Sequence, residues 1–295
     1  MRCGATRTPG AGRMHPYRSV LYMPGSNPRA LEKARSLPAD ALILDLEDAV
    51  APDAKGTARD LVTAAVREGG FGKRRLLVRI NALDTEWGRA DLEAAIAARP
   101  HGILLPKVSR PELIETVAAG LPEGHPSRVW AMMETPEGVL NAAAIAGAPR
   151  MEGFVLGTND LAKDLGTRHR PDRLPLLHAL SQCLLAARAA GLVCLDGVYN
   201  AFRDEAGLEA ECAQGRDMGF DGKTLIHPVQ LEIANRIFAP SEEELALARA
   251  QVAAFEEAQA KGLGVAVLDG RIVENLHVET ARRTLAKADA IARMS

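Results

Sequence analysis

Aromatic residues are scarce in this 295-residue chain, at 4% of the sequence, and neither sign of charge is in large excess. Lys and Arg number 36 against 38 Asp and Glu, so the formal net charge is −2. Proteins that bind single-stranded nucleic acid stack bases on aromatic side chains, and nucleic acids and anionic membranes attract basic surfaces. The composition therefore predicts neither a nucleic acid nor a membrane as a partner.

Cysteines and long apolar runs are also few. No apolar run is long enough to span a membrane, and Met1–Pro16 lacks the hydrophobic centre of a secretory signal. We therefore predict a cytoplasmic protein in which residues 1–16 form a disordered tail, with Met14 as an alternative gene start. The cysteines lack CxxC or Cys/His ligand spacing, which predicts reduced core residues at Cys3, Cys183, Cys194 and Cys212.

What the chain does have is apolar residues, 47% of the total, arranged in short runs between segments of helical spacing. Such runs are typical of buried parallel strands. Eight alternations predict an α/β fold, a (β/α)8 TIM barrel. The alternative is an open doubly wound sheet, but no GxGxxG turn follows the first run. The predicted strands are Ser19–Met23, Ala41–Leu46, Leu76–Ile80, Gly102–Pro106, Val129–Glu134, Gly153–Gly157, Val193–Asp196 and Lys223–Ile226.

The pattern changes after Pro240, so we predict a barrel domain over residues 17–240 and a C-terminal extension over residues 241–295. Ser241–Glu244 resembles a capping box that starts a helix. A hairpin turning at Asp269 and Gly270, and a last helix over Val278–Ala292, are predicted to follow. Because the extension lies outside the eightfold pattern, we interpret it as a packing arm or as a lid over the rim of its own or a neighbouring subunit.

Two carboxylates end consecutive predicted strands, Glu134 and Asp160. Parallel strands bring their C-terminal ends to one rim, which would place these side chains next to each other. Two carboxylates, together with water and substrate oxygens, suit Mg²⁺, which seldom takes a cage made only of protein atoms. The alternative is that both residues cap the helices that follow them.

An arginine, Arg79, ends an otherwise apolar strand and therefore needs an anionic partner. That partner is either the carboxylate of a substrate or an acidic neighbour, Asp45 or Glu47. Strand alternation sends both acidic side chains to one face. Glu47 can then bind the metal through water or orient Arg79.

Backbone N–H groups and basic side chains at other strand ends suit anions. Gly157, Thr158 and Asn159 offer a nest for a carboxylate or an enolate oxygen. Arg29 and Lys33 lie near a helix start after the first strand, where a phosphate can bind, although a solvated helix face explains them equally well. His227, at the tip of the last strand, is either a ligand contact or a structural residue.

Seven segments in order resemble the HpcH/HpaI aldolase superfamily, in its citrate lyase β subunit-like (CitE-like) and malyl-CoA lyase branch. This branch includes the citrate lyase β subunit, malyl-CoA and citramalyl-CoA lyases, and malyl-CoA thioesterase. The resemblance covers the chain from about Arg18 to its end. The matching segments are Arg18–Ser26, Leu44–Pro52, Val78–Asn81, Leu105–Val108, Glu134–Gly138, Gly157–Asp160 and Gly222–Pro228.

The resemblance implies a TIM barrel that uses Mg²⁺, with Mn²⁺ as the alternative cation. The interpretation of the C-terminal extension as a lid favours a homotrimer or a dimer of trimers. The resemblance implies metal ligands at Glu134 and Asp160. A 2-oxo acid substrate is implied to contact Arg79, Glu134, Gly157, Thr158 and Asn159. CoA is implied to contact Tyr22, Arg29, Lys33, His227 and Pro228.

One departure from the family pattern lies near the C-terminus. Lyases of the branch carry an aspartate after a Gly-Arg-hydrophobic-Val stretch, supplied across a subunit interface and implied in acid/base chemistry. Here Glu274 occupies that position, and His277 follows one turn later. The longer side chain changes the hydrogen-bond geometry that proton transfer requires. The implied catalytic residues are therefore Arg79, Glu274 and Glu47.

Three functions remain open from the sequence. The main hypothesis is a Mg²⁺-dependent carbon–carbon lyase that cleaves or forms malyl-CoA or citramalyl-CoA, giving a 2-oxo acid and an acyl-CoA. The alternatives are a malyl-CoA thioesterase, in which water attacks the thioester with Glu274 and His277 as base, and a citrate lyase β subunit working within a larger assembly.

Overall fold

Eight parallel strands, β1 to β8, close into a barrel in which each strand pairs with the next and β8 pairs with β1. The computed structural model describes residues 15–294, so residues 1–14 of the tail predicted over residues 1–16 lie outside the described chain. The barrel confirms the predicted (β/α)8 fold. Its strands are β1 Ser19–Pro24, β2 Ala41–Asp45, β3 Arg75–Arg79, β4 Gly102–Leu105, β5 Arg128–Met133, β6 Met151–Leu156, β7 Val193–Asp196 and β8 Gly222–Leu225.

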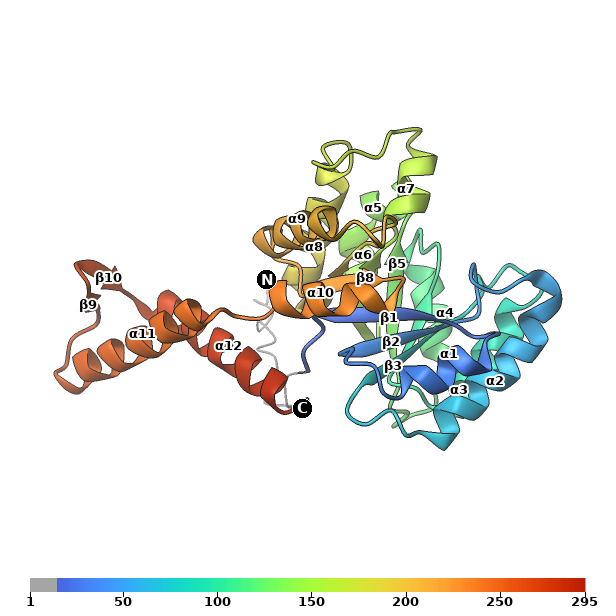
Figure 1. Ribbon diagram of the computed structural model, residues 1–295, viewed down its shortest axis with the longest axis horizontal. Coiled ribbons are helices and arrows are strands. Elements are labelled where there is room, and N and C mark those ends of the chain that lie inside the picture. The colour runs from blue at the N-terminus through green and yellow to red at the C-terminus, as the bar shows by residue number, and fades with distance from the viewer. Residues whose placement is uncertain (1–14, 295) are drawn as a thin grey trace, which may run out of the picture. The chain divides into compact units, whose positions relative to one another are not determined.

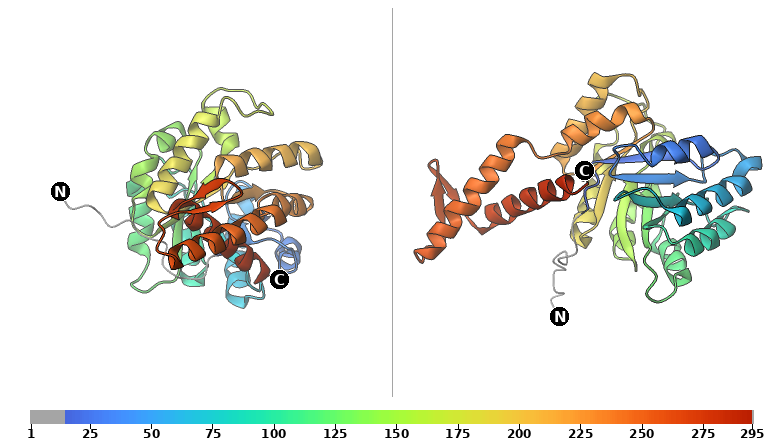
Figure 2. Two further views of the ribbon diagram at one scale, coloured as in Figure 1. Left: turned by 90° about the vertical axis from the view of Figure 1, so that its left-hand side faces the viewer. Right: turned by 60° about the horizontal axis from the view of Figure 1, so that its bottom comes forward.

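Helices surround the strands (Figure 1, Figure 2). Asn27 caps the first of them by accepting a hydrogen bond from the Ala30 N–H at 3.1 Å, and Pro28 occupies the first helical position. The helices of the barrel are α1 Pro28–Ala34, α2 Lys55–Glu68, α3 Gly88–Ala98, α4 Pro111–Gly120, α5 Pro136–Leu140, α6 Ala142–Ala146, α7 Thr158–Asp164, α8 Leu177–Ala190, α9 Glu205–Met218 and α10 Leu231–Ile237, with short 3₁₀ turns η1 Pro52–Ala54 and η2 Pro228–Gln230.

The strands are almost continuous apolar runs because their side chains pack into two apolar clusters, one on each face. Side chains alternate along β2, so that Ile43 belongs to a cluster with Trp130 and Val155, while its neighbours Leu42 and Leu44 pack in a separate, larger cluster that includes helical residues. Both faces of the strand are therefore buried, as in other parallel barrels. This burial fixes the register that carries the polar strand tips to one rim.

Trp130 of β5 is fully buried and depends on glycines in both neighbouring strands. A Cβ on Gly102 of β4 would lie 2.7 Å from the indole Cδ1, and a Cβ on Gly153 of β6 would overlap the six-membered ring. The indole N–H donates to Glu152 Oε2 at 3.0 Å, so the large ring has both space and a polar partner.

Gly153→Ala is therefore expected to lower the free energy of unfolding by about 1–3 kcal/mol, because the added methyl forces Trp130 or the backbone to shift. Gly56→Ala is the matched control, since nothing lies within 4 Å of its added Cβ in α2. The control is expected to be neutral or stabilising by up to about 1 kcal/mol. Urea unfolding of both variants measures the difference, and equal midpoints would contradict the packing argument.

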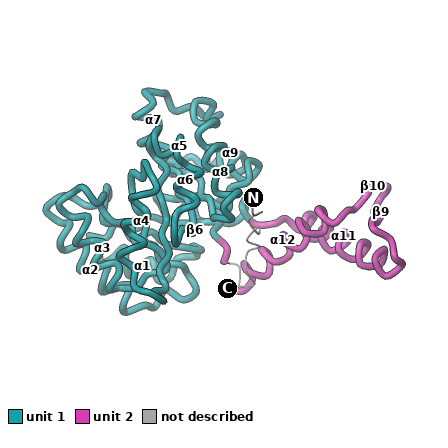
Figure 3. Tube along the Cα trace, turned by 180° about the vertical axis from the view of Figure 1, so that it is seen from behind, with its two compact units in different colours: residues 1–8, 17–238 teal, residues 9–16, 239–295 magenta. Residues whose placement is uncertain are grey.

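The described chain divides into two compact units, and the second unit covers residues 239–294 (Figure 3). It contains α11 Glu242–Ala260, an antiparallel hairpin of β9 Ala266–Leu268 and β10 Arg271–Val273, and α12 Asn275–Ala292. Asp269 and Gly270 both have positive φ, as a tight hairpin turn requires. Phe255, Val273 and Val278 are part of a separate small core in this unit. The predicted lid role stays a prediction.

The structure differs from the spacing of the sequence in three places. The segment after β6 forms α7, where we predict a backbone nest at Gly157, Thr158 and Asn159. Helical spacing extends without a break over Pro136–Ala146 and over Leu174–Ala190, but the first segment is divided at Asn141 into α5 and α6, and α8 begins at Leu177. Among residues 15–294, no helix is long and apolar enough to cross a membrane.

Candidate active site

A cavity of about 320 Å³ opens at the C-terminal rim of the barrel. The ends of β1, β2, β3, β5 and β6 and the segments after β7 and β8 form its wall. Parallel strands with staggered, paired registers deliver these ends together, as in Pro24, Asp45 and Arg79 on β1 to β3. The cavity is lined by Tyr22, Asp45, Asp48, Ala49, Arg79, Met132, Glu134, Leu156, Gly157, Thr158, Asn159, Asp160, Val198 and Ile226.

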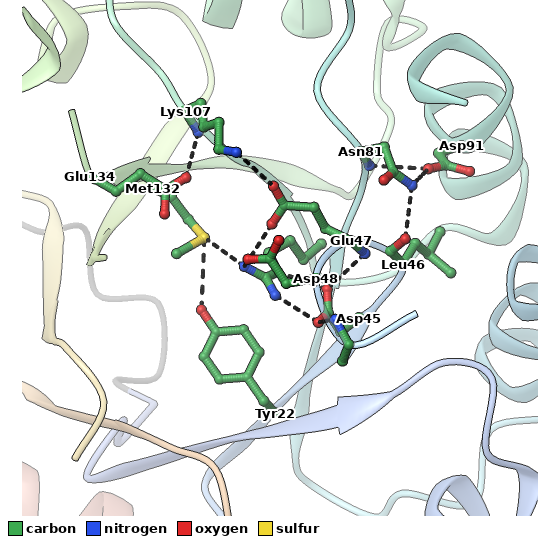
Figure 4. Close-up of polar contacts among 12 residues, drawn as sticks. Tyr22, Asp45, Leu46, Glu47, Asp48, Asn81, Asp91, Lys107, Met132 and Glu134 are labelled. Atoms are coloured by element: carbon green, nitrogen blue, oxygen red, sulfur yellow. Dashed lines mark hydrogen bonds and ion pairs between the residues drawn. The ribbon is translucent and has the colours of Figure 1, made fainter. Parts of the chain in front are cut away.

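Arg79 is held by acidic residues at and after the end of β2, which are labelled Asp45, Glu47 and Asp48 in Figure 4; Asp48 Oδ2 is the most distant, 3.5 Å from Nη1. Its Nε and Nη2 donate to the two carboxylate oxygens of Asp45 at 2.7 and 2.6 Å. Its Nη1 lies 2.7 Å from Glu47 Oε2, and only 7% of the side chain is exposed. Asp45 also accepts the backbone N–H of Glu47 at 2.9 Å. Of the two partners predicted for Arg79, a substrate carboxylate or an acidic neighbour, the observed contacts are those with acidic neighbours.

Tyr22 and Met132 cover the other side of Arg79. The guanidinium lies 4.9 Å from the centre of the Tyr22 ring, and Nη1 is 3.5 Å from Met132 Sδ. The Tyr22 hydroxyl donates to the same sulfur at 3.7 Å. Burial is the main cause that raises the pKa of Tyr22, so the phenol stays protonated and can act as a donor.

Glu134, at the end of β5, is 1% exposed. The backbone N–H of Lys107 donates to its Oε1 at 2.7 Å, and Lys107 has a left-handed backbone with φ 52°. Gly157 lies so close that an added Cβ would overlap Glu134, which is why a glycine is required there. Burial, and then the nearby charge of Glu47, raise the pKa of Glu134 to about 8.

Glu47 is the second buried carboxylate, and one of its oxygens accepts no hydrogen bond from residues 15–294. Its Oε2 makes an ion pair with Arg79 but no hydrogen bond. Burial raises the pKa of Glu47 to about 7, although Arg79 opposes the shift. Lys107 Nζ is 4.0 Å from Oε1. Two neighbouring carboxylates with raised pKa values mark a place where an added positive charge would be stabilised.

These residues fit the hard cation that the sequence predicts. Glu134 and Asp160, which is in the first turn of α7, line one cavity with oxygen ligands only. Within residues 15–294, no group of three or more His, Cys, Asp or Glu is arranged as a metal cage. Mg²⁺ tolerates this because it keeps several water ligands.

Sequence reasoning missed the residues that hold the β2 tip. Lys55 Nζ donates to the carbonyl oxygens of Leu46 and Glu47 at 2.9 and 2.7 Å, and to Asn81 Oδ1 at 2.7 Å. Asn81 in turn donates to Leu46 O at 2.8 Å. Asn81 lies two residues after Arg79, so strand alternation places both side chains on one face. This alternation was the signal in the sequence that could have identified Asn81. Lys55 carried none, because its partners are distant in the chain.

Most of the residues predicted to contact CoA do not line this cavity. Tyr22 lines it, but Arg29, Lys33, His227 and Pro228 do not belong to its wall. Arg29 and Lys33 are exposed on α1. His227 caps η2 by accepting the Val229 N–H at 3.2 Å, and its ring stacks on Phe202 with 4.6 Å between centres. The structural alternative for His227 therefore describes its observed contacts.

The predicted nest and the predicted base also have local partners. Thr158 is buried at the start of α7, and Asn159 exchanges side-chain hydrogen bonds of 2.8 and 3.2 Å with Asn200. Glu274 is exposed in the second unit and precedes α12. Its backbone N–H donates to His277 Nδ1 at 3.0 Å, which turns that ring nitrogen toward the chain.

Comparisons with a family model, with known sequences and with solved structures all point to one family. Residues 18–228 match the family model described as HpcH/HpaI aldolase/citrate lyase. A (3S)-malyl-CoA thioesterase of Cereibacter sphaeroides (strain KD131) is 64% identical over 96% of this chain and 98% of its own length. The citrate lyase subunit beta of Escherichia coli (strain K12) is 37% identical over 92% of this chain and 93% of its own. A crystal structure of CitE from Mycobacterium tuberculosis with magnesium, acetoacetate and coenzyme A has a TM-score of 0.77 at 33% identity, covering 93% of this chain and 98% of that one.

The lyase hypothesis is wrong on these comparisons. Relatives that are 60–64% identical over nearly their whole length are named (3S)-malyl-CoA thioesterase, whereas the lyase names belong to relatives of 34–38% identity. The sequence could not separate the two activities, because the motifs that carried the prediction occur throughout one branch with both.

Proposed function

The chain belongs to the HpcH/HpaI aldolase/citrate lyase family, a family of enzymes, and from this premise we propose that it is a thioesterase that hydrolyses malyl-CoA to malate and free CoA. The observation that carries the proposal is the 64% identity to a (3S)-malyl-CoA thioesterase over 98% of that relative. The small cavity, with buried carboxylates and an arginine in its wall, has the chemistry to hold a charged acyl group.

The proposal includes Mg²⁺ held by Glu134 and Asp160, as magnesium is present in the related CitE crystal structures. When bound, the cation would polarise an acyl oxygen and neutralise carboxylate charge. The chain supplies the orientation: the Lys107 N–H fixes Glu134 Oε1, and the Gly157 backbone packs against the same side chain.

Arg79 would bind the free carboxylate of the acyl group after one acidic partner gives way. Asp45 holds two of its nitrogens in a planar arrangement, and Glu47 contacts the third. Because the pKa of Glu47 is raised to about 7, a proton can neutralise Glu47 near neutral pH, which leaves Nη1 with the exposed Asp48 at 3.5 Å and makes it more accessible to the substrate. Among residues 15–294 the Tyr22 hydroxyl has a thioether as its acceptor, so it is available to a substrate oxygen.

Hydrolysis requires water to add to the thioester carbonyl and the C–S bond to break. We assign the base that accepts the water proton to Glu274, with His277 as its positioning residue, and that proton then passes to the departing thiolate. The assignment includes a homo-oligomer, a trimer or a dimer of trimers, that brings Glu274 of one subunit to the rim of another. CoA contacts at Arg29, Lys33, His227 and Pro228 remain part of the proposal.

A product assay tests this function. Full-length protein incubated with malyl-CoA and Mg²⁺ is expected to release malate and free CoA in equal amounts, without glyoxylate or acetyl-CoA. Glu274→Gln is expected to lower kcat by about 10²-fold or more, since it removes the proposed base. Glu279→Gln, an exposed change in the same helix, is the matched control. Glyoxylate and acetyl-CoA as the products would contradict the thioesterase.

A further inference from the structure

A second cavity, of about 300 Å³, lies beside the first on the same unit. Its wall comes from the segment between α7 and α8 and from the segment between β7 and α9. The two cavities share Thr158, Asn159 and Val198 as lining residues. The hydrogen-bonded amides of Asn159 and Asn200 join α7 to the segment between β7 and α9. Apart from the shared Thr158 and Asn159, neither the family resemblance nor the proposed function uses a residue of this cavity.

Most of the charged side chains that line the second cavity are basic. Arg168, His169, Arg170 and Arg173 line it, and Glu211 is the acidic residue among its lining residues. Glu211 is already engaged, because Lys223 Nζ donates to its Oε1 at 2.6 Å, and the same oxygen lies 3.8 Å from Nη1 of Arg173. Arg170 is paired with Asp172. Arg168 and His169 have no hydrogen bond or ion pair with any of residues 15–294.

Arg173 is the buried element of this wall, with 5% of its side chain exposed. Its Nη1 lies 2.7 Å from both oxygens of Asp196, and its Nε donates to Gln214 at 2.6 Å. Its Nη2 is buried and has no hydrogen-bond partner among residues 15–294. The residue also has a left-handed backbone, with φ 52°. A buried guanidinium nitrogen without an acceptor is unfavourable, and a ligand oxygen would correct this.

Neighbouring groups do not supply that oxygen. Asp204, the other acid near this wall, accepts the Tyr199 hydroxyl at 2.6 Å and caps α9. Asp196 already accepts from Arg173 and from Lys223. The carboxylates around the cavity are therefore committed, whereas Arg168 and one nitrogen of Arg173 are not. Uncommitted guanidinium groups recognise carboxylate and phosphate oxygens through paired N–H donors.

We propose that the second cavity binds a small oxyanion, a carboxylate or a phosphate, between Arg168 on the exposed segment and the buried Arg173. This site goes beyond the proposed function and does not depend on it. Because the site shares Thr158 and Asn159 with the first cavity, an anion there would lie next to the reaction centre without using Glu134 or Arg79.

Binding of inorganic phosphate and of malate to the full chain, in EDTA and without Mg²⁺, tests the proposal by calorimetry. At least one of the two anions is expected to bind with a stoichiometry of one per chain. Arg168→Ala is expected to weaken that binding about tenfold or more, and Arg168→Glu to abolish it. Both changes are in an exposed segment, so the fold is expected to persist. Arg89→Ala, exposed on α3, is the matched control and is expected to bind like the parent.

The calorimetry results distinguish a phosphate site, a carboxylate site and the absence of a site. Phosphate bound without malate identifies a phosphate site, and malate bound without phosphate identifies a carboxylate site. Unchanged binding in Arg168→Ala and Arg168→Glu, equal weakening in Arg89→Ala, or no binding of either anion would overturn the proposal. Failure of the product assay would leave this result unaffected, since no turnover is measured.

Discussion

Replacing Glu134 with glutamine is expected to lower kcat/KM by about 10²–10³-fold while making the metal-free protein more stable at pH 8. The activity falls because one of the two proposed Mg²⁺ ligands loses its charge. The shape of the side chain is kept, and the amide oxygen of the glutamine can still accept the Lys107 N–H that now donates at 2.7 Å. The loss therefore reports the charge and not a rearranged rim.

The gain in stability follows from the pKa of Glu134, which burial raises from 4.5 to about 8. Below pH 4.5 the group is protonated in both the folded and the unfolded chain. As the pH rises from 4.5 to about 8 the unfolded chain ionises first, so the native state loses about 1.4 kcal/mol per pH unit, up to a few kcal/mol. The glutamine variant cannot ionise and is expected to avoid this loss.

Urea unfolding at pH 5, 6.5 and 8 in EDTA measures the effect. The free energy of unfolding of the parent is expected to fall relative to Glu134→Gln as the pH rises, and Mg²⁺ is expected to restore the parent alone. Glu137→Gln, an exposed change three residues later, is the matched control. Parallel pH profiles for the parent and Glu134→Gln would show that the carboxylate is not a buried charge.

Arg79→Met is expected to destabilise the protein by about 3–5 kcal/mol at neutral pH. Methionine keeps much of the volume but leaves Asp45 and Glu47 buried without their cation. The lost stability should shrink as the pH falls below about 7, where the Glu47 carboxyl, whose pKa burial raises to about 7, takes up a proton. It should also shrink in the double variant Arg79→Met with Asp45→Asn, because one uncompensated charge is then removed.

Denaturant midpoints for these variants test the buried network. Arg236→Met is the control, because Arg236 makes a similar pair with Glu209 at 2.8 Å but on the surface. That pair is expected to contribute less than about 1 kcal/mol. If Arg79→Met and Arg236→Met lost the same free energy, the Asp45–Arg79–Glu47 cluster would not be the element that holds the rim.

Most of the fold was accessible from the sequence for a local reason. Runs such as Ala41–Asp45 and Arg75–Arg79 are apolar along their length because parallel barrel strands are buried on both faces. Their alternation with helical segments predicted eight βα units. The division of Pro136–Ala146 into α5 and α6, and the extra helix α7, were missed because the breaks depend on contacts with other segments: Asn141 at the first break donates to Ser109 O at 2.8 Å.

The candidate site was accessible only in part. Glu134, Asp160 and Arg79 were predicted at one rim, since strand tips of a parallel barrel meet there. Their states were not predictable. The pairing of Arg79 with Asp45, and the raised pKa values of Glu134 and Glu47, depend on burial and on charges from other strands. The left-handed backbone of Lys107 had no signal in the sequence at all.

The sequence by itself determined the barrel, the polar strand tips and the family. The first two follow from local patterns of apolar and polar residues, and the family follows from an ordered set of motifs. Tertiary structure alone decided which charges are paired, which carboxylates are buried, and where a guanidinium nitrogen of Arg173 lacks a partner. The physical reason is that desolvation and Coulomb energies depend on distances between residues far apart in the chain, such as Arg173 and Asp196, and no local pattern encodes those distances.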